Sequence, residues 1–170
     1  KSTVTYPTAD YLKSVPTISG TATDPLPGSN RLASGLREVY LEIYDVTFSS
    51  YWSGTAWVNS QSTLSVSGLS DWYYVSTGVA FIHNRQYRIR SKARDLTQPS
   101  PDGVYNDESP LSERLWIYDI FAPTTTIVFP VNAGYYGPSA TIPTISGTAY
   151  DETQDANGYA RVSGAEFAWR

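Results

Sequence analysis

The side chains that most often carry out enzyme chemistry are scarce in this sequence. It holds one histidine, His83, and no cysteine among its 170 residues. It also lacks Gly-x-Ser-x-Gly, His-Glu-x-x-His and a glycine-rich phosphate loop, the motifs whose spacing fixes a nucleophile, a metal or a phosphate. Two carboxylates could hydrolyse a glycosidic bond without a histidine, but nothing in the pattern places two acids in one cleft. We therefore expect a protein that is not an enzyme.

Acidic side chains in the turns of the chain could instead bind calcium, a hard cation that takes six to eight oxygen ligands. The candidate ligands fall into two sets, one for each part of the chain. The first set is Asp24, Asp95, Asp102, Asp107 and Glu108, and the second is Asp119, Asp151, Glu152 and Asp155. No EF-hand-like spacing fixes these ligands, and acidic turns are common in proteins. Ordinary solvated turns therefore remain the alternative interpretation.

A second candidate site is a platform of aromatic rings, because exposed rings stack on the faces of sugars. Its members would be Tyr51, Trp52, Trp57, Trp72, Tyr73 and Tyr74. Tryptophans in a hairpin also pack against each other across the strands. The sequence therefore leaves two interpretations open for these rings, a glycan-binding surface and structural packing.

Composition favours an all-β protein. Aromatic residues make up 14% of the chain, and Ser, Thr, Val and Ile dominate the stretches between them, which suits pleated and half-buried surfaces. With 11 prolines and 12 glycines spread along the sequence, a helix of ordinary length has no room. Because cysteine is absent, we expect packing rather than disulfides to stabilise the fold.

Charge and hydropathy exclude two classes of partner. The net charge is −4 and the sequence pI is about 4.9, whereas nucleic-acid binding generally needs a basic surface. No apolar run approaches the roughly 20 residues of a membrane span, and no signal-peptide pattern follows Lys1. We therefore expect neither nucleic-acid binding nor membrane insertion of this fragment.

One heptapeptide, PTISGTA, occurs twice, at residues 16–22 and 143–149, an offset of 127 residues (143 − 16). The flanks match as well, because TVTYP at residues 3–7 resembles TIVFP at residues 126–130. Such an offset is typical of repeated domains. We expect one complete module at residues 1–120 and the N-terminal part of a second, homologous module at residues 121–170, ending before its copy is complete.

Alternation of apolar and polar side chains places the strands of the first module. Three inward rows are expected: Ile18, Gly20 and Ala22; Val39, Leu41 and Ile43; and Tyr87, Ile89, Ser91 and Ala93. The small side chains of the first row predict a close approach of the partner sheet. A hairpin is expected at residues 51–58, with Gly54 at the positive φ of its turn and Trp52 facing Trp57.

The outward rows of two of these strands carry opposite charge. Glu38 and Glu42 alternate with tyrosines on one strand, and the other carries Arg88, Arg90, Lys92 and Arg94. If the two strands are neighbours in one sheet, the acidic and basic side chains pair across the ladder, each pair contributing a fraction of a kcal/mol. About seven strands in about 120 residues predict a two-sheet sandwich.

The order of these segments resembles bacterial immunoglobulin-like repeats, of the Big and fibronectin-III-like kinds, that recur in tandem in giant cell-surface and secreted proteins. It runs PTISGTATD, a loop ending SGL, the acidic strand, YWSGTAWV, YRIRSKARD and finally DIFAPT. The resemblance implies an immunoglobulin-like Greek-key β-sandwich, an extracellular or cell-surface location, and calcium where consecutive modules meet. The loops at residues 24–34 and 95–110 are longer than the short turns usual in such repeats.

These observations together predict a non-catalytic structural repeat of a long extracellular stalk, adhesin or surface filament. Its partners would be the neighbouring modules of the same protein, and the proline of the junction at Ala122 and Pro123 would restrict bending between them. Two alternatives remain open. One is a glycan-binding module that uses the aromatic hairpin to bind a cell-surface glycan or receptor. The other is a self-assembling filament subunit whose partial second module is completed by a neighbour.

Overall fold

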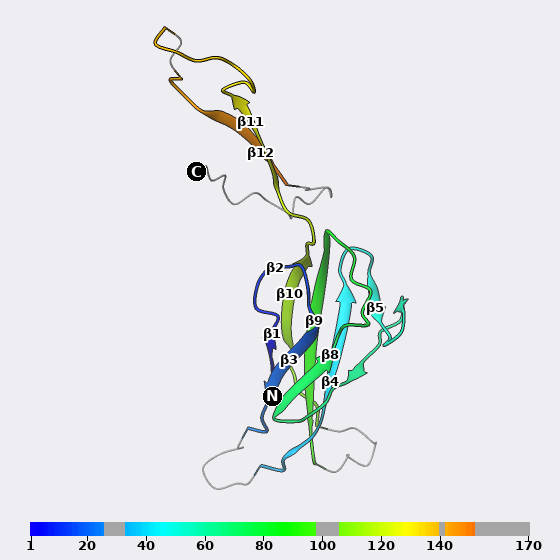
Figure 1. The fold of residues 1–170 in the computed structure, drawn as a ribbon. Helices are drawn as coiled ribbons and strands as arrows, with labels where there is room; N and C mark the ends of the chain where they lie inside the picture. The colour runs from blue at the N-terminus through cyan, green and yellow to red at the C-terminus, as the bar shows by residue number, and fades with distance from the viewer. Residues whose placement is uncertain (26–32, 98–105, 140–141, 152–170) are drawn as a thin grey trace. The chain divides into compact units, whose positions relative to one another are not determined.

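The computed structural model describes residues 1–25, 33–97, 106–139 and 142–151. The chain divides into two units, Lys1–Asp119 and Ile120–Arg170, one residue before the expected boundary. All elements in the described ranges are β-strands, as the sequence composition predicts (Figure 1). Across these ranges, no helix is long and apolar enough to cross a membrane.

The first unit consists of two sheets. The smaller sheet has the order β1 (Ser2–Tyr6), β3 (Thr17–Ala22) and β8 (Asp71–Val75). The larger has the order β2 (Tyr11–Leu12), β10 (Ser112–Tyr118), β9 (Arg85–Asp95), β4 (Leu36–Asp45), β5 (Ser50–Trp52) and β6 (Trp57–Val58), and β7 (Leu64–Ser65) also pairs with β4. The β10–β2 pair is parallel and the others are antiparallel.

Side chains from both sheets form one core, as in a β-sandwich. In Figure 1 the smaller sheet lies in front of the long strands β4 and β9. The three inward rows that alternation predicts are confirmed, because every member is buried: Ile18, Gly20, Ala22, Val39, Leu41, Ile43, Tyr87, Ile89, Ser91 and Ala93. Alternation with a period of two therefore places β3, β4 and β9 correctly.

The close approach at Gly20 comes from the same sheet rather than from the opposite one. Gly20 lies opposite Trp72 of β8, and a Cβ on Gly20 would clash with the Trp72 ring and with the backbone oxygen of Thr3 in β1. The prediction that the partner sheet fills this space is thus corrected. A glycine is required here because a neighbouring strand lays a tryptophan across it.

The predicted pairing of the charged rows is confirmed. Strands β4 and β9 are antiparallel neighbours, with Glu38 opposite Arg94 and Glu42 opposite Arg90. Glu38 forms an ion pair with Arg94, the residue directly opposite it. Glu42 instead forms an ion pair with Arg88, at 3.4 Å between Oε1 and Nη2. The basic row therefore meets acidic side chains of its own sheet.

The predicted hairpin at residues 51–58 is confirmed as strands β5 and β6. Trp52 lies opposite Trp57, their ring centroids are 5.4 Å apart in an edge-to-face arrangement, and Gly54 has a φ of 104°. The turn needs a glycine because a side chain is disfavoured at this positive φ.

The second unit, taken by itself, contains a hairpin of β11 (Thr124–Phe129) and β12 (Ser146–Tyr150). Its register matches that of β1 and β3. Val4 pairs with Gly20, a bulge follows, and Tyr6 pairs with Ser19; likewise Ile127 pairs with Gly147, a bulge follows, and Phe129 pairs with Ser146. The two copies of the heptapeptide thus form hairpins with the same pairing and the same irregularity.

Candidate functional site

A pocket of about 750 Å³ lies at the end of the first unit where β9 finishes. The predicted calcium ligands Asp24, Asp95, Asp107 and Glu108 all line it. The sequence therefore correctly brings these four carboxylates to one pole of the module. What each carboxylate contacts decides what the pocket can do.

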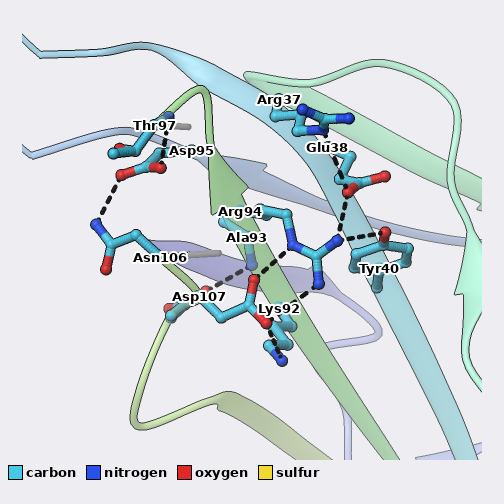
Figure 2. A network of polar contacts seen from close by, with 11 residues as sticks. Arg37, Glu38, Tyr40, Lys92, Ala93, Arg94, Asp95, Thr97, Asn106 and Asp107 are labelled. Atoms are coloured by element: carbon cyan, nitrogen blue, oxygen red, sulfur yellow. Dashed lines mark hydrogen bonds and ion pairs between the residues drawn. The ribbon is translucent and has the colours of Figure 1, made fainter. Parts of the chain in front are cut away.

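Arg94 is the centre of a polar network beside this pocket (Figure 2). Its Nε donates to Asp107 Oδ1 at 2.6 Å and its Nη2 donates to Oδ2 at 3.2 Å, a two-pronged contact. Its Nη1 donates to Glu38 Oε1 at 2.8 Å and to the Tyr40 hydroxyl at 3.2 Å. The guanidinium therefore joins β4, β9 and the segment that contains Asp107.

The ionised form of Asp107 is stabilised by its partners. The Arg94 hydrogen bond is the main cause that holds the pKa of Asp107 below its usual value, against the opposing effect of burial. Lys92 adds an ion pair at 2.6 Å between Nζ and Oδ2. Asp107 also raises the pKa of the Arg94 guanidinium by accepting its hydrogen bonds. Both charges of this pair are therefore satisfied within the protein.

Asp95 organises the turn that follows β9. Its Oδ1 accepts the Thr97 backbone N–H at 2.9 Å and its Oδ2 accepts the Asn106 side-chain amide at 2.7 Å. Burial acts to raise the pKa of Asp95, but these hydrogen bonds from Thr97 and Asn106 outweigh it, and the pKa lies below the usual value. Asp95 thus connects Thr97, just after β9, to Asn106, further along the segment between β9 and β10.

Glu108 ties the smaller sheet to the larger one. Its Oε2 accepts the Ser2 backbone N–H at 2.8 Å, the Ser2 hydroxyl at 2.5 Å and the Ala93 backbone N–H at 3.0 Å. The Ser2 hydroxyl also contacts the Ser91 hydroxyl at 2.9 Å, and both serines are fully buried. The chain of contacts runs from β1 through Glu108 to β9 and across the core.

Asp24 closes the loop that precedes β4. Its Oδ2 accepts the Ser34 hydroxyl at 3.0 Å and the Gly35 backbone N–H at 2.8 Å. The sequence carries the signal for this role, because both copies of the repeat place an aspartate after the heptapeptide and a Ser-Gly pair further on. We predicted a calcium ligand at Asp24, and the structure adds a loop-closing contact.

The remaining predicted calcium ligands are not in this pocket. Asp119 follows β10 at the other end of the first unit, where its Oδ1 lies 3.4 Å from Nδ1 of His83. Asp151 belongs to the second unit and is buried. Asp102, Glu152 and Asp155 lie outside the described residues. Within the described ranges, no three His, Cys, Asp or Glu side chains gather so that they could hold a metal ion.

The predicted aromatic platform is divided between the two sheets. Trp52 and Trp57 lie on the larger sheet and Trp72 lies on the smaller one. Trp72 is 1% exposed and Trp52 is 4% exposed, because both pack into the core. Trp57 and Tyr51 are half-buried; Trp57 stacks on Tyr87 and donates its indole N–H to the Ala80 oxygen at 3.0 Å. The buried rings of Trp52 and Trp72 therefore offer no face to a sugar, whereas Tyr51, Trp57 and Tyr74 are half-buried and Tyr73 is exposed, and glycan binding stays a prediction.

Each of the four pocket carboxylates has a hydrogen-bond donor within the described protein, although Asp107 alone among them forms ion pairs with other described residues and Glu108 Oε1 is buried without a hydrogen-bond partner there. The carboxylates accept hydrogen bonds from backbone N–H groups, hydroxyls or the basic row of β9, and the contacts link segments that are far apart in the sequence. Sequence reasoning missed Ser2 and Ser91 in this role, because a serine in an alternating strand carries no signal of its distant partner. The hydrogen bonds of the pocket residues hold together strands that are distant in the sequence.

Comparison with protein-family models, with curated proteins and with solved structures finds no match for this chain.

Proposed function

We propose that this chain is a non-catalytic structural repeat of a long extracellular stalk, adhesin or surface filament. In this proposal the first unit is an immunoglobulin-like Greek-key module, and the second unit begins another copy of it. The partners would be neighbouring modules of the same protein. Calcium bound near Asp119 at the junction, as the resemblance implies, would stiffen the angle between modules.

One observation carries the proposal, namely the matching register of the two hairpins. Val4 pairs with Gly20 before a bulge, and Ile127 pairs with Gly147 before an equivalent bulge. Sequence similarity alone could persist in two segments that fold differently. Equal pairing and an equal bulge favour two copies of one structural unit, which is what an array of modules requires.

The contacts of the first unit suit a module that carries tension. Strand β1 begins at Ser2, and Glu108 fastens Ser2 to Ala93 of β9. The Arg94–Asp107 pair fastens the end of β9 to the segment before β10. These hydrogen bonds and ion pairs connect the first strand of the unit to its last strands. A force applied to the two ends of the unit is therefore expected to act on several of these contacts at once.

Single-molecule stretching of the 170-residue chain tests the mechanical role. At about 3.6 Å per extended residue, unfolding of Lys1–Asp119 should add about 40 nm of length in one step. We expect this step to recur after relaxation, because the core of the first unit is self-contained. Gradual lengthening without a discrete step would contradict the role as a spacer.

Protease treatment of intact source cells tests the location. An extracellular stalk should release fragments that contain the first unit without cell lysis, since the junction between modules is the accessible part of such an array. Release only after lysis would contradict the extracellular proposal, and it would leave the mechanical result unaffected.

A further inference from the structure

The second unit presents a sheet edge that is occupied in the first unit. Strand β11 pairs with one edge of β12, and no strand in the described part of the chain pairs with the other. On β12 and just before it, Ile145, Gly147 and Ala149 correspond to Ile18, Gly20 and Ala22 at the repeat offset of 127 residues. In the first unit these three positions are buried. In the second unit the glycine and the alanine are exposed and the isoleucine is half-buried.

Strand β8 is what covers this row in the first unit. It pairs antiparallel with β3 and sets Trp72 opposite Gly20. The indole N–H of Trp72 donates to the Thr21 oxygen at 3.2 Å, and the Ala22 N–H donates to the Ser70 oxygen at 2.8 Å. At this edge of β3, Gly20 leaves room for the Trp72 ring and the Thr21 carbonyl accepts its indole N–H. The Ala22 N–H donates to the backbone of the segment that leads into β8.

The second unit retains each of these features. Gly147 leaves a side chain-free position, and a Cβ there would clash with the Thr126 oxygen just as one on Gly20 would clash with that of Thr3. Thr148 corresponds to Thr21 and Ala149 to Ala22 in the matching hairpin register. An unpaired edge of this kind is a template for an added strand.

We propose that the edge of β12 away from β11 accepts an antiparallel strand that corresponds to β8 and belongs to the same polypeptide, with a tryptophan opposite Gly147. The source within one polypeptide follows from the first unit, in which β3 and β8 belong to one chain. The tryptophan follows from shape, because a small side chain would leave the space over Gly147 unfilled and a charged one would be buried without a partner. The inference rests on the proposed role of the second unit as a repeat of the first.

The test supplies such a strand and measures the edge directly. Residues 68–77 (GLSDWYYVST), which contain β8, are appended after Arg170 through a flexible Gly/Ser linker that gives an effective concentration of about a millimolar. Amide hydrogen exchange of Ala149 is then followed by NMR. We expect exchange at Ala149 to slow at least about tenfold relative to the 170-residue chain, because its N–H gains the bond that Ala22 makes.

Two matched pairs of variants show whether binding of the appended strand to β12 is specific. Ala149→Lys places a charge on the row that the strand should bury and should restore fast exchange of the edge. Thr148→Lys places the same charge on the opposite face of β12 and should leave the protection intact. In the appended segment, replacing the tryptophan copied from Trp72 with alanine should abolish the protection, and replacing the tyrosine copied from Tyr73, exposed on the outer face of β8, should not.

Three results would overturn the proposal. The first is equal Ala149 exchange with and without the appended strand. The second is an edge that is already protected in the 170-residue chain. The third is protection of that chain that rises with protein concentration, which would assign the strand to a second copy. The stretching step of the first unit does not depend on β12, so these failures are distinguishable from failure of the proposed function.

Discussion

The indole ring of Trp72 occupies the space that a side chain on Gly20 would need. The two residues face each other across the β3–β8 pair, and Trp72 is almost completely buried. The backbone oxygen of Thr3 closes the other side of the glycine. Gly20 is therefore confined between two strands of one sheet, and the fold depends on its lack of a side chain.

Gly20→Ala should lower the free energy of unfolding by about 3 kcal/mol, because the added methyl group forces the Trp72 ring and the β1 backbone apart. Urea denaturation followed by tryptophan fluorescence measures the change. Gly78→Ala is the matched control, since a Cβ at Gly78 meets nothing within 4 Å. It should change the stability by less than about 1 kcal/mol. Equal effects of the two substitutions would show that Trp72 does not confine Gly20.

Asp107→Asn should destabilise the first unit in a pH-dependent manner. The Arg94 hydrogen bond holds the pKa of Asp107 below its unfolded value, which is about 3.9 for an aspartate. A lowered pKa contributes stability that is present above the unfolded pKa and is lost as the pH falls through the folded pKa. We expect a loss of about 1–2 kcal/mol at pH 7, allowing for the partial exposure of the pair.

The difference between Asp107→Asn and the wild-type protein should shrink as the pH falls from about 4 through the lower folded pKa of Asp107, because the wild-type side chain then also becomes uncharged in the folded protein. Thermal unfolding at a series of pH values measures it. Glu113→Gln, which removes a more exposed partner of Arg90, is the control and should change the stability by at most about 0.5 kcal/mol. A destabilisation by Asp107→Asn that is constant from pH 7 to pH 2 would contradict the ionic origin of the effect.

Tyr87→Phe should remove part of the alkaline sensitivity of the protein. Burial raises the pKa of Tyr87 to about 12, whereas an unfolded tyrosine ionises near pH 10. A raised pKa contributes stability that is fully present below the unfolded pKa and is lost as the pH rises through the folded pKa. The wild-type stability should therefore fall between about pH 10 and pH 12, and that of the variant should fall less.

The same substitution has a separate effect at neutral pH. The Tyr87 hydroxyl accepts the Ile82 N–H at 2.8 Å, so Tyr87→Phe should lower the stability by about 1 kcal/mol at pH 7. Chemical denaturation at pH 7 and pH 11 separates the two contributions. Parallel pH dependence of the two proteins would mean that Tyr87 titrates in the folded state as it does in the unfolded chain.

The sequence predicts the strands well because alternation is a local signal. It places the buried rows of β3, β4 and β9 correctly, and opposite charges correctly pair β4 with β9. It does not assign Trp72 to the smaller sheet, since alternation tells which face a residue occupies and not which strand lies beside it. The tie between Ser2 and Glu108 spans 106 positions, and no local pattern announces it.

The place of the candidate site can be predicted from the sequence, and its calcium-binding role stays a prediction. The sequence gathers Asp24, Asp95, Asp107 and Glu108 at one pole, and the structure places them around one pocket. Carboxylates at one end of a module can bind a cation or accept hydrogen bonds from the protein itself. Which of these roles a carboxylate has depends on its contacts, such as the hydrogen bond from Arg94 to Asp107. Those contacts come from the strand register, which composition and spacing do not fix.

Trp52→Ala distinguishes structural packing from glycan binding by the aromatic hairpin. Trp52 packs into the core, and its truncation should lower the free energy of unfolding by about 3–5 kcal/mol. Tyr73→Ala, at an exposed position on β8, should change it by less than about 0.5 kcal/mol. Thermal unfolding and retention on a sugar array are measured for both variants. A Trp52→Ala variant that keeps the wild-type stability but loses retention on the array would favour glycan binding, because a ring that contacts a sugar is exposed and supports little of the fold.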